Sequence, residues 1–145
     1  MRTLVVLIAL LAYNAAVRTV KLDCPKTDTI TKQEMDDAVF VAKVKVETKG
    51  AEGSGDTRGT YTDYVLYNLK YEKILYSYYE WFSELTIIRG APTTLKINKR
   101  CNITLDKGVD YVLGSKMYEE PKFNFVKPLI NVTESEWRLI NKTKD

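Results

Sequence analysis

The clearest hydrophobic pattern along the chain is an alternation with a period of two between residues 38 and 47. Its apolar positions fall on one face and its charged positions on the other: Ala38, Phe40, Ala42, Val44 and Val46 against Lys43, Lys45 and Glu47. Successive side chains of a strand point to opposite faces, and β-branched residues favour strands. The segment therefore predicts a half-buried strand.

Several further segments also predict strands. Residues 60–75 alternate apolar and polar positions; although Tyr64, Tyr67 and Tyr71 also fit helical spacing, abundant Tyr, Val and Thr and missing helix caps favour a strand. Shorter predicted strands cover residues 85–89, 93–97, 109–114 and 123–126. The glycine-rich segment 49–59 predicts a loop, and Lys107-Gly108 predicts a turn.

Two capping boxes predict short helices near the ends of the domain. Thr31 with Glu34 begins one through about residue 37, and Thr133 with Glu136 begins another through about residue 141. Five or six strands with such helices indicate a mostly β fold. A single sheet would leave its edges exposed, and closing it into a small barrel removes them. The pattern predicts a five-stranded OB-type barrel with short flanking helices, with a sandwich as the alternative.

The first residues have the features of a secretion signal. Arg2 is followed by an unbroken apolar run from Leu4 to Ala12, far shorter than the ~20 residues that a membrane span needs. We expect residues 1–16 to be a signal peptide, cleaved after Ala16 or Ala15; a buried N-terminal helix is the alternative. Residues 17–145 then form one secreted, extracellular domain without a membrane span.

Glycosylation motifs and cysteines fit an extracellular location. Asn102, Asn131 and Asn141 each begin an N-x-[ST] sequon. In an oxidising compartment the two cysteines, Cys24 and Cys101, most simply pair with each other, and two free or intermolecular thiols are the competing interpretation.

Composition disfavours catalysis and metal binding by the chain itself. Without histidine there is no Ser-His-Asp triad and no His-ligated zinc, and two cysteines cannot form a four-cysteine zinc site. Adjacent acids such as Asp36 and Asp37 are usually solvated charge. With 22 Lys and Arg against 19 Asp and Glu, the net charge of +3 is too small to indicate nucleic acid. We expect neither an enzyme nor a cofactor.

Aromatic residues concentrate in one stretch of the chain. Seven of the ten tyrosines lie between Tyr61 and Tyr79, followed by Trp81 and Phe82. One interpretation is an exposed aromatic binding surface, formed by Tyr76, Tyr78, Tyr79 and Trp81. The other is strand core with a partly buried loop, because alternation accounts for half of the tyrosines.

Several landmarks together resemble a known family. They are the strand 38–47 with its Val41-Ala42-Lys43-Val44 run, the stretch 70–75 ending a tyrosine-rich strand, a Leu-x-x-Gly turn at 105–108, and the strand 110–117. In this order they resemble the netrin-like module, and most of all the N-terminal domain of tissue inhibitors of metalloproteinases. The resemblance covers residues 24–140 and implies an OB barrel.

In that family inhibition works by a wedge, so the resemblance implies a secreted inhibitor of an extracellular zinc metalloproteinase. The family's N-terminal cysteine binds the protease zinc through its free α-amine and carbonyl oxygen. By this resemblance Cys24 is that cysteine and Cys101 its disulfide partner. The implied wedge residues are Cys24, Pro25, Lys26, Lys99, Arg100 and Cys101.

The chain departs from the family pattern at the wedge. Residues 17–23 precede Cys24 after the predicted cleavage, so its nitrogen is an amide, which is a poor zinc ligand. Lys26 replaces the second cysteine of the family's Cys-x-Cys start, and four of six family cysteines have no counterpart. The alternative is a non-inhibitory extracellular protein-binding module on the same scaffold.

Overall fold

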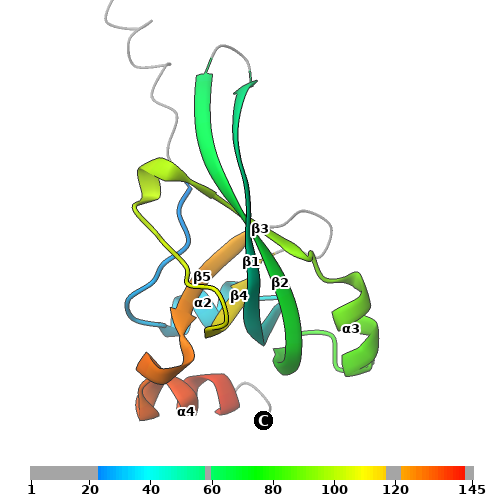
Figure 1. The fold of residues 1–145 in the computed structure, drawn as a ribbon. Coiled ribbons are helices and arrows are strands. Elements are labelled where there is room, and N and C mark those ends of the chain that lie inside the picture. The colour runs from blue at the N-terminus through cyan, green and yellow to red at the C-terminus, as the bar shows by residue number, and fades with distance from the viewer. Residues whose placement is uncertain (1–22, 58–59, 117–121, 143–145) are drawn as a thin grey trace, which may run out of the picture.

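The computed structural model describes residues 23–57, 60–116 and 122–142, so the predicted signal peptide lies outside the described residues (Figure 1). Its elements, in order, are α2 (Lys32–Asp37), β1 (Phe40–Thr57), β2 (Thr60–Ser77), α3 (Glu84–Gly90), β3 (Thr94–Asn98), η1 (Lys99–Cys101), β4 (Asp110–Ser115), β5 (Phe123–Pro128), η2 (Leu129–Asn131) and α4 (Glu134–Lys142).

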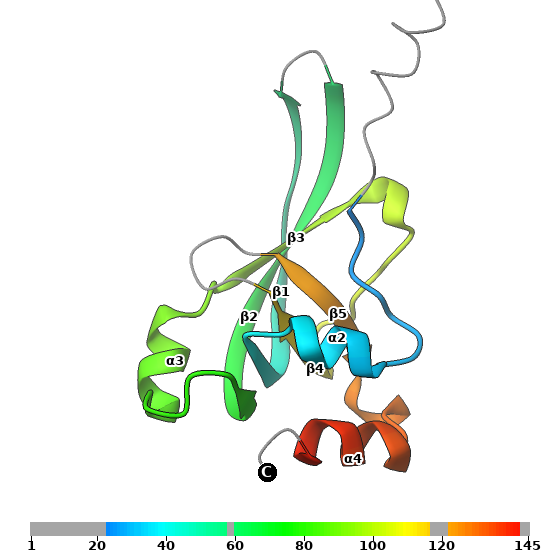
Figure 2. The same cartoon turned by 180° about the vertical axis from the view of Figure 1, so that it is seen from behind.

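The five strands form one antiparallel sheet in the order β3-β2-β1-β4-β5, with β1 at its centre (Figures 1 and 2). The sheet curls into a barrel-like shape, which confirms the predicted mostly β, OB-type fold. In the part of the chain that the structure describes, however, β3 and β5 do not pair with each other, so the barrel is not closed by strand pairing.

An N-terminal arm, residues 24–26, covers part of this opening. The Lys26 amide donates to the Asn124 carbonyl over 2.9 Å, and the Val126 amide donates back to the Lys26 carbonyl over 2.8 Å. The arm thus forms a parallel bridge on the outer edge of β5. A disulfide joins Cys24 to Cys101 in η1, directly after β3. The arm therefore occupies an edge that would otherwise offer unpaired backbone groups.

The core divides between the two faces of the sheet. The predicted apolar face of β1 is buried, and Phe40, Ala42, Val44 and Val46 pack inside the barrel. The opposite face carries Val41, which packs under α2 and α4 with Met35 and Ile140. Several strand tyrosines are core residues: Tyr67 is 1% exposed, and its hydroxyl accepts a hydrogen bond from the Leu105 amide.

The predicted loop at 49–59 is wrong in extent. β1 continues to Thr57 and β2 begins at Thr60, so the two strands form a long hairpin (Figure 1). Pairing with the long β2 provides backbone hydrogen bonds that outweigh the weak strand propensity of glycine. One glycine has a packing reason, because a Cβ at Gly53 would collide with the Tyr64 ring on the paired strand.

The predicted strand at 85–89 is also wrong, because these residues form helix α3. Ser83 is its N-cap, and the Ser83 hydroxyl accepts a hydrogen bond from the Thr86 amide over 3.2 Å. Glu84 in the first turn suits the helix dipole. Only Ile87 of the apolar run is buried, so a one-sided contact with the barrel suffices to hold the helix.

Two buried glutamates bind the predicted helices to the arm and to β5. Glu34 of the α2 capping box pairs with Lys26, while Glu136 accepts from the Ile30 amide over 2.7 Å and from Lys127 Nζ over 2.7 Å. Burial acts to raise the pKa of each carboxyl, but these donors outweigh it and lower both pKa values to about 2. Both glutamates are therefore charged and fully bonded near neutral pH.

Candidate functional site

The loop between β2 and α3 brings together the aromatic side chains that the sequence singled out. The ring centroid of Tyr79 lies 5.4 Å from that of Tyr78, 5.3 Å from that of Trp81 and 5.5 Å from that of Phe82. We call these four residues the aromatic cluster. Most of the contacts are edge-to-face, the geometry that aromatic quadrupoles favour. Tyr79 is therefore the centre of the cluster.

The cluster presents large apolar side chains to solvent. Trp81 is 73% exposed and Tyr78 is 65% exposed, and Leu85 on the neighbouring α3 is 56% exposed. Contiguous exposed apolar groups often mark an interaction site, whereas single exposed ones are ordinary. Exposed rings therefore follow the end of β2, whereas tyrosines such as Tyr67 are strand core; that the exposed rings bind a partner stays a prediction.

Backbone hydrogen bonds hold the loop in place at both ends. The Tyr78 amide donates to the Val39 carbonyl over 2.8 Å, and the Phe82 amide donates to the Tyr79 carbonyl over 3.2 Å. At the other end, the Glu84 carboxylate accepts from the Ile74 amide over 2.8 Å. The Ser83 cap then begins α3. The aromatic cluster is thus fixed by neighbouring elements and needs no partner to form.

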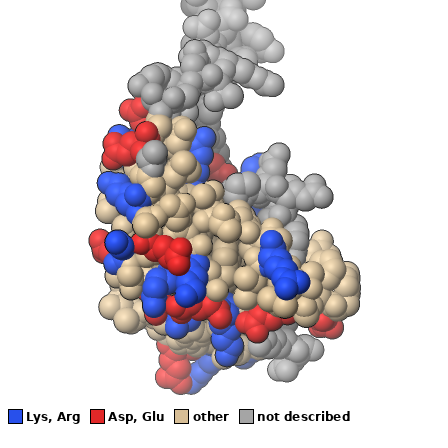
Figure 3. Space-filling model, turned by 45° about the vertical axis from the view of Figure 1, so that its right-hand side comes forward, with Lys and Arg blue, Asp and Glu red and all other residues tan. Residues whose placement is uncertain are grey.

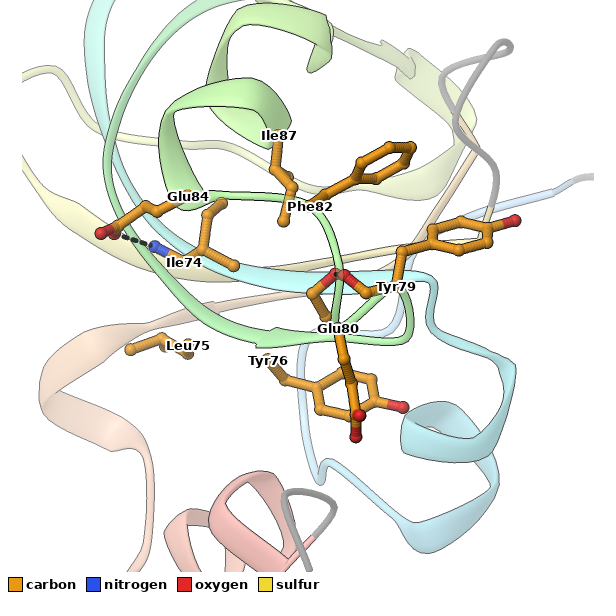
Figure 4. A pocket seen from close by; sticks show the side chains of 9 residues that line it. Ile74, Leu75, Tyr76, Tyr79, Glu80, Phe82, Glu84 and Ile87 are labelled. Carbon is orange, nitrogen blue, oxygen red and sulfur yellow. Dashed lines mark hydrogen bonds between the residues drawn. The ribbon is translucent and has the colours of Figure 1, made fainter.

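A hollow of about 380 Å³ lies beside the cluster, between the end of β2 and α3 (Figure 4). Ile74 and Ile87 supply its aliphatic wall, and Tyr79 and Phe82 also line it. Its remaining side chains are Leu75, Tyr76, Ser77, Glu80 and Glu84. The hollow thus combines aromatic and aliphatic walls with two carboxylates.

The charge beside Tyr76 is negative. Burial raises the pKa of the Tyr76 hydroxyl, and the nearby groups of Tyr78, Asp36 and Glu80 raise it further. A neighbouring negative charge disfavours the ionised phenol. Tyr76 therefore stays a neutral hydroxyl at the edge of an acidic hollow.

The predicted wedge residues also lie together, where the N-terminal arm meets η1 directly after β3. Besides the Cys24–Cys101 disulfide, this region contains Pro25, which is half-buried, and Arg100, which is exposed. Lys26 pairs with Glu34, and Lys99 pairs with Glu52 over 2.8 Å. We call Cys24, Pro25, Lys26, Lys99, Arg100 and Cys101 the disulfide ridge. Its lysines are already neutralised by carboxylates of the chain.

The three predicted glycosylation asparagines are exposed. Asn102 directly follows the ridge and has a left-handed backbone with φ of 53°. Asn102 and Asn131 line the same shallow hollow beside β5, and Asn141 lies in the last turn of α4. Glycans at the first two positions would occupy the side of the molecule that carries the disulfide ridge.

The described basic residues on the β1 face are paired with acidic side chains. Lys43 and Lys45 on β1 both pair with Glu72 and Asp110, and Lys96 lies 4.0 Å from the centre of the Tyr64 ring. Figure 3 shows acidic and basic side chains interspersed over one face. This distribution gives no support to nucleic-acid binding.

The described residues offer neither a metal cluster nor a membrane-spanning helix. Among residues 23–57, 60–116 and 122–142, no cluster of three or more acidic or cysteine side chains is placed to hold a metal ion. Within those ranges, no helix is long and apolar enough to cross a bilayer.

Sequence reasoning predicted the aromatic surface but missed the hollow beside it. Glu80, Glu84, Ile74 and Ile87 lie in the same stretch of chain, yet they meet only because α3 folds back against the end of β2. The signal that could have revealed this was the Ser83-Glu84 pair, which is a helix start rather than part of a strand.

The family described as excretory-secretory protein 2 matches residues 22–141. The crystal structure of Ancylostoma ceylanicum excretory-secretory protein 2 shares 26% sequence identity with this chain, covers 81% of it and 98% of its own length, and superposes with a TM-score of 0.49. No curated protein matches the sequence.

Proposed function

Because the chain belongs to the excretory-secretory protein 2 family, we propose that it is a secreted protein that binds an extracellular protein partner through the aromatic cluster. The chain acts by binding rather than by catalysis. The observation that supports this proposal is the exposure of Trp81 and Tyr78 on a loop held at both ends.

Protein interfaces favour such an arrangement. Tyr and Trp are enriched among the residues that contribute most of the binding free energy, and they work best in a surface that is already ordered. Here Tyr79 supports Tyr78 and Trp81 from beneath, so little conformational entropy is lost when a partner covers them. Secretion agrees with the family name, the predicted signal peptide and the sequons.

The test is the double substitution Tyr78→Ala/Trp81→Ala, because both side chains are exposed and Tyr79 keeps its place. Partners cross-linked to the secreted protein in its own extracellular fluid are identified, and their dissociation constants are then measured with purified components. We expect the double variant to weaken binding by more than about tenfold. Ile130→Ala is the matched control, because Ile130 is 90% exposed elsewhere on the surface. Unchanged affinity in the double variant would overturn the proposal.

Inhibition of a zinc metalloproteinase by the disulfide ridge is the second candidate. The observation that favours it is the disulfide between the N-terminal arm and η1, with Arg100 exposed beside it. In this chain Cys24 follows Asp23, so its nitrogen is an amide with a delocalised lone pair. Inhibition by zinc chelation therefore requires a processing step that leaves Cys24 at the N-terminus.

Two measurements test this second candidate. N-terminal sequencing of the secreted protein shows whether the chain begins at Val17 or at Cys24. Inhibition constants against zinc metalloproteinases are then compared for proteins made with each start. Inhibition by the Cys24 form alone would support chelation, and no inhibition by either form would exclude it. The likeness to tissue inhibitors of metalloproteinases stays a prediction until then.

A further inference from the structure

We propose that the hollow beside the aromatic cluster binds a lysine or arginine side chain of the protein partner. This inference rests on the proposed function, because it assigns a chemistry to the partner of the same surface. The shape of the hollow, its charge and the rings that line it all suit such a side chain.

The shape of the hollow suits a long side chain with a polar end. A volume of about 380 Å³ falls within the range of small-ligand sites. Ile74, Ile87, Phe82 and Tyr79 are among the apolar and aromatic side chains that line it. Lysine and arginine bury their methylene stems along surfaces of this kind while the charged end stays near polar groups.

The charge of the hollow selects a cation. Glu80 is exposed, and within the described ranges no lysine or arginine forms an ion pair with it. Glu84 uses one carboxylate oxygen to accept from the Ile74 amide, so its second oxygen can still accept a hydrogen bond from a ligand. Residues 76–88 contain these two glutamates and no basic residue, although the chain as a whole carries +3. The negative charge is therefore local to this surface.

A neighbouring carboxylate, Asp36, strengthens the preference of the hollow for a cation. Asp36 of α2 is close enough to influence Tyr76, although it also pairs with Lys32 over 2.7 Å. A neutral or anionic group entering the hollow would meet Glu80 and Glu84 without compensation. A cation would instead form charge-assisted hydrogen bonds with them.

Aromatic rings add a second source of cation affinity. The faces of Tyr, Trp and Phe carry negative quadrupole potential and attract ammonium and guanidinium groups within about 6 Å. Tyr76, Tyr79 and Phe82 line the hollow, and Trp81 contacts the latter two rings. Because Tyr78, Trp81 and Leu85 extend the apolar surface beyond the hollow, the geometry favours a side chain presented by a protein over a free small cation.

The experiment is an NMR titration of the secreted protein with three probes. N-acetyl-arginine amide and N-acetyl-lysine amide carry the cation, and N-acetyl-citrulline amide is a neutral analogue of the first. We expect the two cationic probes to shift the signals of residues 74–87 and the Trp81 indole. The citrulline probe should bind roughly fivefold more weakly or not at all.

Substitutions test which side chains bind the cationic probes. Glu80→Gln keeps the shape of the side chain and should weaken the cationic probes roughly threefold to fivefold. Phe82→Leu keeps an apolar wall without a ring and should weaken them as well. Glu47→Gln removes the same charge from an exposed position of β1 outside the hollow and should leave binding unchanged. Circular dichroism shows that each variant is folded.

Several results would overturn the inference. The first is that the citrulline probe shifts the signals as much as the arginine probe does. The second is that Glu80→Gln and Glu47→Gln weaken binding of the cationic probes equally. The third is that choline binds whereas neither cationic amino-acid probe does. Failure of this inference is distinguishable from failure of the proposed function. If Tyr78→Ala/Trp81→Ala abolishes partner binding while Glu80→Gln leaves it intact, the aromatic surface stands and the cation site does not.

Discussion

The aromatic cluster follows β2 and the disulfide ridge includes η1, directly after β3; the two regions are built by different interactions. The ridge is covalently joined, and Lys26 and Lys99 are paired with carboxylates of the chain. The cluster has no covalent tie, and Trp81 and Tyr78 remain largely exposed. The family resemblance points to the ridge, whereas the uncovered apolar surface lies at the cluster.

This difference teaches that one region fixes the fold and the other is available to a partner. Interactions that are already satisfied within the chain stabilise it but leave little to offer another molecule. Exposed rings on an ordered loop contribute little to stability and much to binding. Substitutions in the ridge should therefore lower the free energy of unfolding more than the affinity for a partner. Substitutions in the cluster should lower the affinity more than the free energy of unfolding.

Removing the disulfide should have the largest effect on stability. Cys24→Ser/Cys101→Ser opens a covalent loop of 78 residues, counted from 24 through 101. Chain entropy predicts a loss of up to about 4.5 kcal/mol in the free energy of unfolding, measured by urea denaturation. Mild reduction of the unmodified protein should reproduce the loss. A change below about 1 kcal/mol would show that the ridge does not hold the arm.

Protonation of either buried glutamate should have the next largest effect. Glu34 and Glu136 have pKa values of about 2 when folded, below the usual 4.5. Their stabilisation is complete above about pH 5 and is lost as the pH falls toward 2, on the order of 3 kcal/mol for each. Urea denaturation at pH 7 and pH 3 measures the decrease, which Glu136→Gln should reduce. Glu47→Gln should show the full decrease, and an equal decrease in both variants would contradict the assignment.

The helix cap beside the aromatic cluster should have a moderate effect. Ser83→Ala removes the acceptor for the Thr86 amide and should cost about 1 kcal/mol in the free energy of unfolding. It should also loosen the hollow, which depends on α3. Ser83→Asp supplies a different cap and should retain most of the stability. Identical midpoints of urea denaturation for wild type and Ser83→Ala would show that α3 needs no cap.

The exposed rings should matter least for stability. Tyr78→Ala/Trp81→Ala is expected to change the free energy of unfolding by less than about 1 kcal/mol, because both side chains are mostly in solvent. Thermal denaturation and circular dichroism check this, with Ile130→Ala for comparison. A large loss would mean that the cluster is part of the core and would weaken its assignment as a binding surface.

Much of the fold was predictable where local pattern and tertiary packing agree. The period-two pattern around Val44 and the capping boxes at Thr31 and Thr133 predict elements that the structure confirms. The hairpin beyond Lys49 was not predictable from composition, because glycine propensity is overridden by pairing with β2. Residues 85–89 have strand-forming side chains, and only the Ser83 cap indicates the helix.

The candidate site was predictable only in part, because some of its contacts also depend on tertiary folding and not on local pattern. The concentration of Tyr78, Tyr79 and Trp81 in sequence is enough to indicate an aromatic surface. The hollow depends on Ile74 and Glu84 meeting across the turn into α3, and ten residues separate them in the chain. Contacts of this kind follow from the path of the backbone, which propensity alone does not give.

The disulfide also makes residues 24–101 a covalent ring that contains β1, β2, α3 and β3. A protease that cuts after an aromatic residue in the loop 78–82 would cleave inside this ring. The two resulting pieces would stay linked through Cys24 and Cys101, and the sheet would continue to hold them. A cut beyond Cys101 has no such linkage. The loop that exposes Trp81 and Tyr78 to such proteases is thus a part of the molecule where a single cut releases nothing.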